Sequence, residues 1–344
     1  MIGDRSLIFA RISDNQRSAE EIVTGTIFFF RRKKIGFIDV GTNSVRYLAA
    51  DIPPRGDTIL LGRGLSTPRL GEGVSVSGML QPTAIRRTIL ALREIADDLA
   101  GKGVTDFECV GTEALRAARN ACAFLREAAK LGLKIEILLG EEEAELISRG
   151  AADDLPVSSS EYILADIGGG SAEIIVRRRG KRAAVASLPL GCVRLQETFG
   201  GEDESSRAKI REFCRWKLEE ASIPSSRAPL IGLGGTFTTL AAIHRELEIY
   251  RGDLVHGIRL SRARVGEILG RLCALPLPRR KKVAGLEPSR ADIILPGIAI
   301  AEAVMDHLGA PEVTISDRGI LFGLLARREE TARCERSSRP RPRP

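Results

Sequence analysis

Apolar residues in this chain fall into short runs that end at glycine-rich turns, and one such arrangement occurs twice. Segment 35–50 contains an apolar run, the turn Gly-Thr-Asn-Ser and a second apolar run, and segment 162–176 repeats this order around Gly-Gly-Gly-Ser. Asp39 and Asp166 hold the same position, two residues before the first glycine of each turn. Each segment predicts a strand, a tight turn and a strand, so we expect two related halves.

The rest of the chain alternates strand-like and helix-like patterns. The clearest helix begins at Pro82 and ends at Gly101, because apolar residues recur there every three or four positions. Residues 62–78 are rich in glycine and serine and are expected to form a loop. Strands that alternate with helices indicate an α/β fold. The other strands are predicted at 107–110, 134–139, 230–233 and 313–316, and the other helices from 113 to 131, from 141, from 238, from 291 to 308 and from 318 to 328.

The length of 344 residues suits about two domains with their own cores. A polar stretch, 153–161, has the composition of a linker between them. The end of the chain alternates arginine with proline, a pattern typical of disorder. We therefore expect an N-terminal extension at 1–34, domain I at 35–150, domain II at 151–317, a segment 318–330 that packs back on domain I, and a disordered tail at 331–344.

The net charge of +7 would suggest a partner of high negative charge, but the positive charge is concentrated at the two ends of the chain. Residues 1–34 contribute +3 and residues 327–344 contribute +4, so residues 35–326 are neutral. Aromatic residues make up only 4%, so we expect no nucleic-acid surface on the folded body. The densest basic run of the neutral part, Arg-Arg-Lys-Lys at 279–282, is either solvated or lines the path of an anionic substrate.

The six cysteines are scattered and form no C-x-x-C pair, which favours neither a zinc site nor a disulfide framework. This usage suits a reducing compartment. The longest apolar stretch near the N-terminus, 22–30, is too short to span a bilayer. Four basic residues follow it, where a signal peptide would have small residues for cleavage. We therefore expect a cytoplasmic protein without a membrane partner.

The two glycine turns have the chemistry of phosphate-binding loops. Glycine leaves backbone N–H groups uncovered, and clustered N–H groups bind phosphate oxygens. Asp39 and Asp166, at the ends of the entering strands, either hold a divalent cation or are solvated turn caps. Both turns lead into strands and the chain has no G-x-x-x-x-G-K-[ST], so it is not a P-loop protein. The candidate phosphate-binding residues are Gly41, Thr42, Asn43, Ser44, Gly168, Gly169, Gly170 and Ser171.

Other side chains could complete a phosphoryl site. Glu173 shares a strand face with Ser171, so its carboxylate either points into the same cleft or is an ordinary edge residue. The run Glu-Glu-Glu at 141–143 opens a helix, where it favours the helix dipole or supplies a general base. Arg116 is a solvated arginine or a bidentate phosphate ligand. A third glycine turn, 232–236, leads from a strand into a helix and either holds a phosphate or packs closely.

With these motifs in order, the sequence resembles the exopolyphosphatase/guanosine-pentaphosphate phosphohydrolase (Ppx/GppA) family of the actin–hexokinase–Hsp70 superfamily. Eight ordered stretches are far more specific than one glycine turn. They cover about residues 35–326 and read IGFIDVGTNSVRYL, VGTEALRAARN, EILLGEEEAELI, ILADIGGGSAEIIV, LPLGCVRL, LIGLGGTFTTLAAI, VAGLEPSRADIILPGIAI and ISDRGILFGLL.

The resemblance implies two ribonuclease-H-like domains around a cleft, and a Mg²⁺-dependent hydrolysis of terminal phosphoanhydride bonds. The substrate would be inorganic polyphosphate or guanosine pentaphosphate, and orthophosphate would be released. By position, Glu143 matches the family's catalytic glutamate. Arg116 matches the arginine of its T-x-x-x-R segment and Glu173 the glutamate after its second phosphate loop, so these two are expected to be catalytic as well. Asp39 and Asp166 match the acidic residues of the two phosphate loops and are the expected metal ligands. The choice between the substrates stays open, and so does the oligomeric state, with a homodimer as one alternative.

The chain also departs from the family pattern. Ala172 stands where the family commonly has threonine, and the segment 1–34 is not a family feature. The sequence ends without the additional C-terminal helical domains of the long forms, so we expect a short form. Two alternatives remain, an ATP-dependent kinase or ATPase of the same superfamily and a sensor that binds polyphosphate or alarmone without hydrolysis. Intact Asp39, Glu143 and Asp166 favour an enzyme over the sensor.

Overall fold

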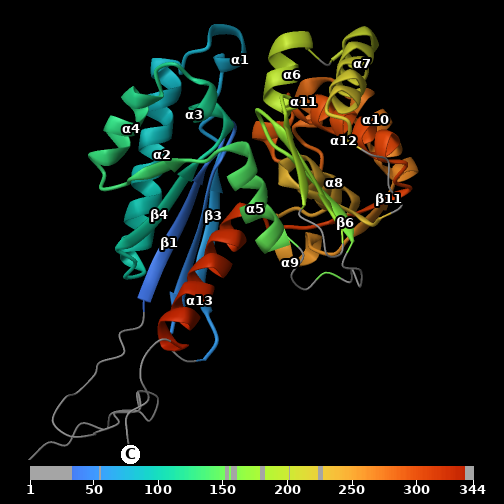
Figure 1. Ribbon diagram of the computed structural model, residues 1–344. Coiled ribbons are helices and arrows are strands. Elements are labelled where there is room, and N and C mark those ends of the chain that lie inside the picture. Colours follow the sequence, from blue (N-terminus) through green and yellow to red (C-terminus); the bar gives the residue numbers. More distant parts are fainter. Residues whose placement is uncertain are drawn as a thin grey trace, which may run out of the picture.

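The computed structural model describes residues 33–53, 56–151, 155, 161–178, 183–200, 202–223 and 228–337. These residues form two lobes, each built on one β-sheet, with helices α5 (Gly140–Ala151) and α13 (Ile320–Ser337) between the sheets (Figure 1). Most of the segment 1–34 and of the linker 153–161 lies outside the described residues, as does the tail from residue 338 onward. None of the described helices is long and apolar enough to cross a bilayer.

The first lobe is built on a five-stranded sheet in the order β3-β2-β1-β4-β5. The first three strands form an antiparallel meander, and β4 and β5 run parallel to β1. Asp39 lies opposite Arg46 in the first hairpin, so the turn 41–44 stands at the end of the sheet. The strands are β1 (Lys33–Val40), β2 (Val45–Ile52), β3 (Ile59–Ser66), β4 (Asp106–Gly111) and β5 (Ile135–Ile137).

The second lobe repeats this topology and adds one strand at the edge, in the order β10-β11-β9-β6-β7-β8. Its first three strands again form an antiparallel meander, with β9 and β11 parallel to β6 and β10 antiparallel to β11. Two sheets of one topology confirm the predicted α/β fold with two ribonuclease-H-like halves. The strands are β6 (Tyr162–Ile167), β7 (Ala172–Arg177), β8 (Ala184–Leu188), β9 (Leu230–Leu233), β10 (Arg259–Ser261) and β11 (Glu312–Ile315).

The helices of the first lobe follow the predicted pattern in part. Helix α2 has the predicted bounds, and its apolar face buries Leu92 and Leu99 completely. The stretch 113–131, predicted as one helical segment, divides into two helices at residues 118–120. The helices are α1 (Val74–Ser77), α2 (Pro82–Gly101), α3 (Glu113–Ala117) and α4 (Ala121–Ala129).

The second lobe is rich in helices, several of which the sequence pattern did not indicate. Helix α8 begins at Gly234, directly after β9, instead of at residue 238. Helix α12 begins at Ile294, so Pro296 lies in its first turn. The N–H groups of this turn have no partner within the helix, so proline loses no helical hydrogen bond there. The helices are α6 (Cys192–Phe199), α7 (Glu204–Glu220), α8 (Gly234–His244), α9 (Gly252–Val255), α10 (Arg262–Cys273), α11 (Leu277–Arg280) and α12 (Ile294–Leu308), with a 3₁₀ turn at Pro288–Arg290.

Two predicted boundaries are wrong. Residues 62–66, predicted as part of a loop, belong to β3. A Cβ at Gly64 would lie 2.5 Å from the ring of Tyr47 on the neighbouring strand, so glycine is required there to admit the ring. Residues 331–337, predicted as part of a disordered tail, are the last two turns of α13.

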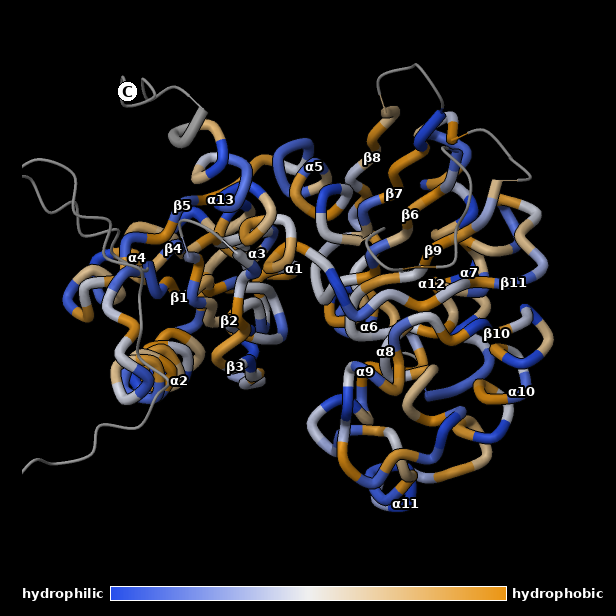
Figure 2. The backbone as a smooth tube through the Cα atoms, turned by 90° about the horizontal axis from the view of Figure 1, so that it is seen from below, coloured by the Kyte–Doolittle hydropathy of each residue, from blue (hydrophilic) through white to orange (hydrophobic). Residues whose placement is uncertain are grey.

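Helices α5 and α13 pack against each other where the two lobes meet (Figures 1 and 2). Helix α5, which ends the first lobe, packs on β7 and β8 of the second, whereas α13 packs back on β1 and β2 of the first. A Cβ at Gly150 would lie 2.5 Å from the carbonyl oxygen of Gly319, so the two helices touch through their backbones. One apolar cluster joins residues of both sheets to both helices, which makes the helix pair the joint of the molecule.

Candidate active site

The two glycine turns face each other across the cleft between the lobes. They have the same internal geometry, because the N–H of Gly41 donates to the carbonyl of Ser44 at 2.9 Å and that of Gly168 donates to Ser171 at 3.0 Å. A Cβ at Gly169 would lie 3.2 Å from the backbone nitrogen of Asn43, so the second turn reaches the first. The repeat seen in the sequence therefore becomes a pair of opposed loops.

The loops enclose a small cavity of about 70 Å³. It is lined from both lobes, so the predicted site residues meet although they come from distant parts of the chain. Arg116 does not line the cavity but contacts Glu143, which does. The predicted residues that line it are Asp39, Gly41, Thr42, Asn43, Ser44, Glu143, Asp166, Gly168, Gly169, Gly170, Ser171 and Glu173.

Asp39 is held by an arginine on the partner strand of its hairpin. The guanidinium of Arg46 donates to Oδ2 of Asp39 from Nη2 at 2.8 Å and from Nε at 3.2 Å. The other carboxylate oxygen, Oδ1, is buried and has no hydrogen-bond partner among the described residues. A buried carboxylate oxygen without a partner is costly, which indicates that a ligand completes this position.

Asp166 occupies the equivalent place in the second loop without such an arginine opposite it, since Glu173 stands there. The pKa of Asp166 is raised to about 6, mainly by burial, with Arg46 opposing the rise and the charge of Asp39 adding to it. The third glycine turn packs on this carboxylate, because a Cβ at Gly234 would lie 2.4 Å from Oδ1 of Asp166. The turn 232–236 therefore forms part of the site.

Glu143 reaches the cavity from the first turn of α5. Its side chain is only 10% exposed, and Arg116 donates to its Oε2 from Nη1 at 3.2 Å. Burial raises the pKa of Glu143 well above its ordinary value, the charge of Glu173 adds to this, and Arg116 opposes it. Glu142 instead accepts a hydrogen bond from the N–H of Leu139 at 2.8 Å and acts as a local cap.

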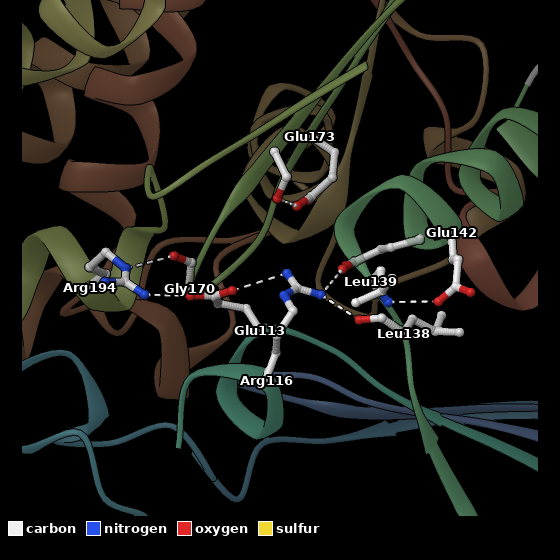
Figure 3. Close-up of polar contacts among 10 residues, drawn as sticks. Glu113, Arg116, Leu138, Leu139, Glu142, Gly170, Glu173 and Arg194 are labelled. Atoms are coloured by element: carbon white, nitrogen blue, oxygen red, sulfur yellow. Dashed lines mark hydrogen bonds and ion pairs between the residues drawn. The ribbon is translucent and has the colours of Figure 1, made fainter. Parts of the chain in front are cut away.

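Glu173 approaches from the opposite wall, on β7 (Figure 3). The hydroxyl of Ser187 donates to its Oε1 at 2.8 Å. Burial raises the pKa of Glu173 to about 7, and the charge of Asp166 contributes to the rise. Glu143 and Glu173 are thus two buried carboxylates, one from each lobe, whose charges oppose each other's ionisation.

The structure brings two arginines to the phosphate loops that the sequence did not place there. Arg46 could have been found, because strand alternation places it on the same face as Ser44 at the end of the first loop. Arg290 lies far along the chain, and its Nη2 donates to the hydroxyl of Ser44 at 3.3 Å. Burial lowers the pKa of Arg290, and Gly235 leaves room for its guanidinium. No local pattern connects residue 290 with the first loop.

The described residues contain no group of three or more His, Cys, Asp or Glu that could hold a metal ion alone. Mg²⁺ does not require one, because it binds through one or two carboxylates, waters and the oxygens of a substrate phosphate. The unpartnered Oδ1 of Asp39 and the nearby Asp166 offer hard oxygen ligands of this kind. The donor set therefore fits a divalent cation that binds together with a phosphate.

A larger cavity of about 840 Å³ adjoins the small one, and Arg46, Asp166 and Arg290 line both. Lys281 and Lys282 of the basic run 279–282 also line the larger cavity. Arg280 does not, so only part of the run lies where an anionic substrate could pass. The Arg280 side chain is 1% exposed and donates to both carboxylate oxygens of Glu202 and to three backbone carbonyls, those of Leu272, Leu275 and Ala291.

Comparison with known proteins identifies relatives over most of the chain. The sequence profile of the Ppx/GppA phosphatase family matches residues 55–332. Exopolyphosphatase 2 of Mycobacterium tuberculosis is 33% identical over 312 residues, which cover 85% of this chain and 97% of that protein. The guanosine-5'-triphosphate,3'-diphosphate pyrophosphatase of Aeromonas hydrophila is 26% identical and is matched over 88% of this chain and 61% of its own length.

The fold has relatives among solved structures as well. The Ppx/GppA enzyme of Aquifex aeolicus superposes with a TM-score of 0.70 and is 31% identical, over 86% of this chain and all of that one. With the two sheets of like topology, this likeness places the lobes among the ribonuclease-H-like domain pairs of the actin/hexokinase/Hsp70 superfamily.

Proposed function

The chain belongs to the Ppx/GppA phosphatase family and is a phosphoanhydride hydrolase, and on that premise we propose its substrate, its cofactor and the roles of its residues. The substrate is inorganic polyphosphate, guanosine pentaphosphate or both, and orthophosphate leaves from the chain end. One observation carries the proposal: a buried glutamate of raised pKa, Glu143, faces two opposed glycine loops in one enclosed cavity. This arrangement suits a base that acts on a water beside a bound phosphoryl group.

The loops bind the terminal phosphoryl group. Backbone N–H groups of residues 42–44 and 169–171 surround its oxygens, and Arg290, beside Ser44, adds a fixed positive charge. Arg116 contributes a second guanidinium from the side of Glu143. Phosphoryl transfer passes through a loose transition state with charge spread over the equatorial oxygens, so positioned donors and cations are the main source of acceleration.

Glu143 accepts a proton from the attacking water. The water oxygen forms a bond to the terminal phosphorus, the bridging P–O bond breaks, and the electron pair leaves with the shortened chain. The proton stays on the Glu143 carboxylate until solvent removes it. A raised pKa suits this task, because a base is most effective when its pKa approaches the working pH. Glu173, on the facing wall, accepts the second hydrogen bond of the water and fixes its direction of attack.

Asp39 and Asp166 would hold a divalent cation, Mg²⁺. Oδ1 of Asp39 has no other partner among the described residues, which supports this assignment. When bound, such an ion neutralises negative charge on the phosphoryl oxygens. Arg46 keeps the Asp39 carboxylate in place through its two hydrogen bonds.

The larger cavity receives the part of the substrate that leaves. It begins at Arg46 and Arg290, where the phosphate site ends, and it carries Lys281 and Lys282 on its wall. Its 840 Å³ exceed what one phosphate needs and are in the range of ordinary ligand pockets. Both a polyphosphate chain and a nucleotide fit this description, in agreement with the two activities named among the relatives.

The cellular location and the partners are proposed from the cysteines, the net charge and the helices. We place the enzyme in the cytoplasm, because the described residues include all six cysteines and form no disulfide. No nucleic-acid or membrane partner is proposed, since residues 35–326 carry no net charge and no described helix could span a bilayer. A homodimer stays a proposal.

A phosphate-release assay tests this function. The full chain is incubated with long polyphosphate, guanosine pentaphosphate or ATP, each with Mg²⁺ or with EDTA. We expect Mg²⁺-dependent release of orthophosphate from at least one of the first two, faster than from ATP. Faster turnover of ATP would indicate the ATPase alternative. Binding of polyphosphate or guanosine pentaphosphate without any release would indicate a sensor.

A further inference from the structure

A chain of charged contacts leads from the second phosphate loop to the first lobe, and Figure 3 shows it from Gly170 through Arg194 and Glu113 to Arg116. Arg194 of α6 donates from Nε to the carbonyl of Gly170 at 2.9 Å and from Nη2 to Oε1 of Glu113 at 2.5 Å. Oε2 of Glu113 accepts from Nη2 of Arg116 at 3.0 Å, and Arg116 continues to Glu143. None of the roles proposed above involves Glu113 or Arg194.

Glu113 stands between two arginines from different lobes. Arg116 follows it by three residues on the short helix α3 of the first lobe, whereas Arg194 belongs to the second lobe. The three side chains are only 19–24% exposed, so water screens their interaction less than that of a surface pair. Each oxygen of Glu113 serves one arginine, and the carboxylate therefore couples Arg116 to the other lobe.

The contact depends on closure of the lobes. A Cβ at Gly170 would lie 2.6 Å from Cγ of Glu113, so the second phosphate loop rests directly on this side chain. The start of α6 is fixed to the same loop, because the N–H groups of Val193 and Arg194 donate to the carbonyl of Gly169 at 2.9 and 3.1 Å. Arg194 is thus an extension of the phosphate loop that reaches across the cleft.

We propose that Glu113 and Arg194 are a positioning pair, which holds Arg116 in its working place only when the second phosphate loop has closed on the first lobe. The proposal rests on the proposed function, in which Arg116 supports the phosphoryl site through its contact with Glu143. In an open cleft Glu113 keeps one arginine partner and loses the other, and Arg116 loses its connection to the loop that carries the phosphate. Loop closure and placement of the arginine thereby become one event.

Helix α6 supplies a matched control one turn further on. Glu197 also crosses to the first lobe, where its Oε1 accepts from the N–H of Gly73 at 2.7 Å and its Oε2 accepts from the hydroxyl of Ser75. It contacts neither Arg116 nor Glu113 in the contacts of the described residues. Glu197 therefore contributes to closure of the cleft without reaching the reacting groups.

The experiment measures kcat and KM for phosphate release by Glu113→Gln, Arg194→Gln, the double variant and Glu197→Gln. We expect each of the first two to lower kcat by about tenfold, as removal of one charge-assisted contact does. The double variant should lose no more than about twofold beyond the larger single loss, because both changes break the same connection. Glu197→Gln should change KM and leave kcat within about twofold. Melting temperatures measured in parallel separate these effects from loss of fold.

Three results would contradict the proposed pair. The kcat losses of the two single variants could multiply in the double variant, or Arg194→Gln could leave kcat unchanged. The third is a kcat loss in Glu197→Gln as large as that in Arg194→Gln. If Arg194→Gln does not fold, Arg194→Lys is judged by the same criteria, with a smaller loss expected because lysine keeps the charge but cannot serve both acceptors. Failure of the proposed function would instead show as absence of phosphate release by the unmodified chain.

Discussion

At the scale of single residues, the site concentrates carboxylates where water is scarce. Asp39, Asp166, Glu143 and Glu173 are all buried around one small cavity. Like charges at short range oppose ionisation, and burial does so as well, so the pKa values of three of these groups are raised. Such displaced values are typical of sites that bind cations or move protons.

The raised pKa of Glu143 predicts how turnover responds to acid. A base works only when it is deprotonated, so kcat should fall as the pH drops through the pKa of Glu143. That fall should come at a higher pH than an ordinary glutamate would give. Glu173→Gln removes a neighbouring negative charge, which lowers the pKa of Glu143 and moves the acidic limb to lower pH. A limb that keeps its position in this variant, measured from kcat between pH 5 and 9, would contradict the coupling.

The metal assignment is tested by Asp166→Asn. Loss of an anionic oxygen should raise the Mg²⁺ concentration needed for half-maximal activity by about tenfold or more, because hard cations bind carboxylate far better than amide. Asp97→Asn changes an exposed aspartate of α2 in the same way and should leave the titration unaltered. An unchanged Mg²⁺ requirement in the Asp166 variant, at unchanged melting temperature, would count against a role as ligand.

Residue roles were only partly predictable from the sequence. The run Glu141–Glu143 offered three equivalent carboxylates, and pattern alone could not select one. The orientation of α5 determines which of the three glutamates enters the site. Ala144 and Ile147 are buried on the inner face of the helix with Glu143 beside them, whereas Glu141 and Glu142 are exposed. The resemblance to known enzymes had singled out Glu143, whereas the contribution of Arg290 depends on tertiary folding and had no local signal.

At the scale of elements, the basic run 279–282 shows how a charge pattern can mislead. Arg280 lies inside the second lobe, where it joins α11 to the backbone near the end of α10 and to Ala291, between the 3₁₀ turn and α12. Its neighbours Lys281 and Lys282 are exposed on the wall of the large cavity. Adjacent residues of one helical turn point in different directions, so a run of four cations was never one surface.

Because Arg280 is buried and Lys281 is exposed, we expect their substitution to affect the stability of the fold to very different degrees. Arg280→Ala should lower the free energy of unfolding by about 3 kcal/mol, because it leaves buried carbonyls without their donor. Lys281→Ala should change it by no more than about 0.5 kcal/mol. Urea titrations followed by circular dichroism would measure both. Equal effects of the two changes would mean that Arg280 is not the anchor its contacts indicate.

Elements were predicted best where one periodicity dominates. The two hairpins and α2 follow clear apolar patterns, and the structure places them where these patterns predicted. Strand β3 was missed because Gly62 and Gly64 suggest a loop, although Gly64 only makes room for the ring of Tyr47. The closeness of α5 and α13 was not visible either, since it depends on glycines in helices that are far apart in the sequence.

At the scale of the whole molecule, two lobes of one topology differ in what they bring to the cleft. The first supplies Glu143 and Arg116, the second supplies Glu173 and Arg290, and each supplies a phosphate loop. The paired helices α5 and α13 join the lobes through backbone contacts at Gly150 and Gly323. Phosphoryl transfer at this site requires residues of both lobes. Since each lobe contributes one phosphate loop, the repeated loop was the first indication of the site in the sequence.

The larger cavity predicts how long substrates are held. Lys281→Gln combined with Lys282→Gln should raise KM for long polyphosphate more than for short chains and should flatten the dependence of log KM on log salt concentration. The physical reason is that a chain held by fewer cations releases fewer counterions on binding. Arg93→Gln combined with Lys209→Gln removes two exposed cations that line neither cavity and serves as the control. Equal losses for short and long chains would place the substrate elsewhere.

We propose that Glu143 activates water against a phosphoryl group held between the two loops. This proposal is tested most directly by Glu143→Gln, with Glu141→Gln as a control that changes an exposed glutamate two residues earlier. Phosphate release and substrate binding are measured for both variants. We predict that Glu143→Gln binds substrate as the unmodified chain does and releases phosphate about 10²–10⁴ times more slowly, with Glu141→Gln unaffected. Release near the unmodified rate by Glu143→Gln would contradict the account.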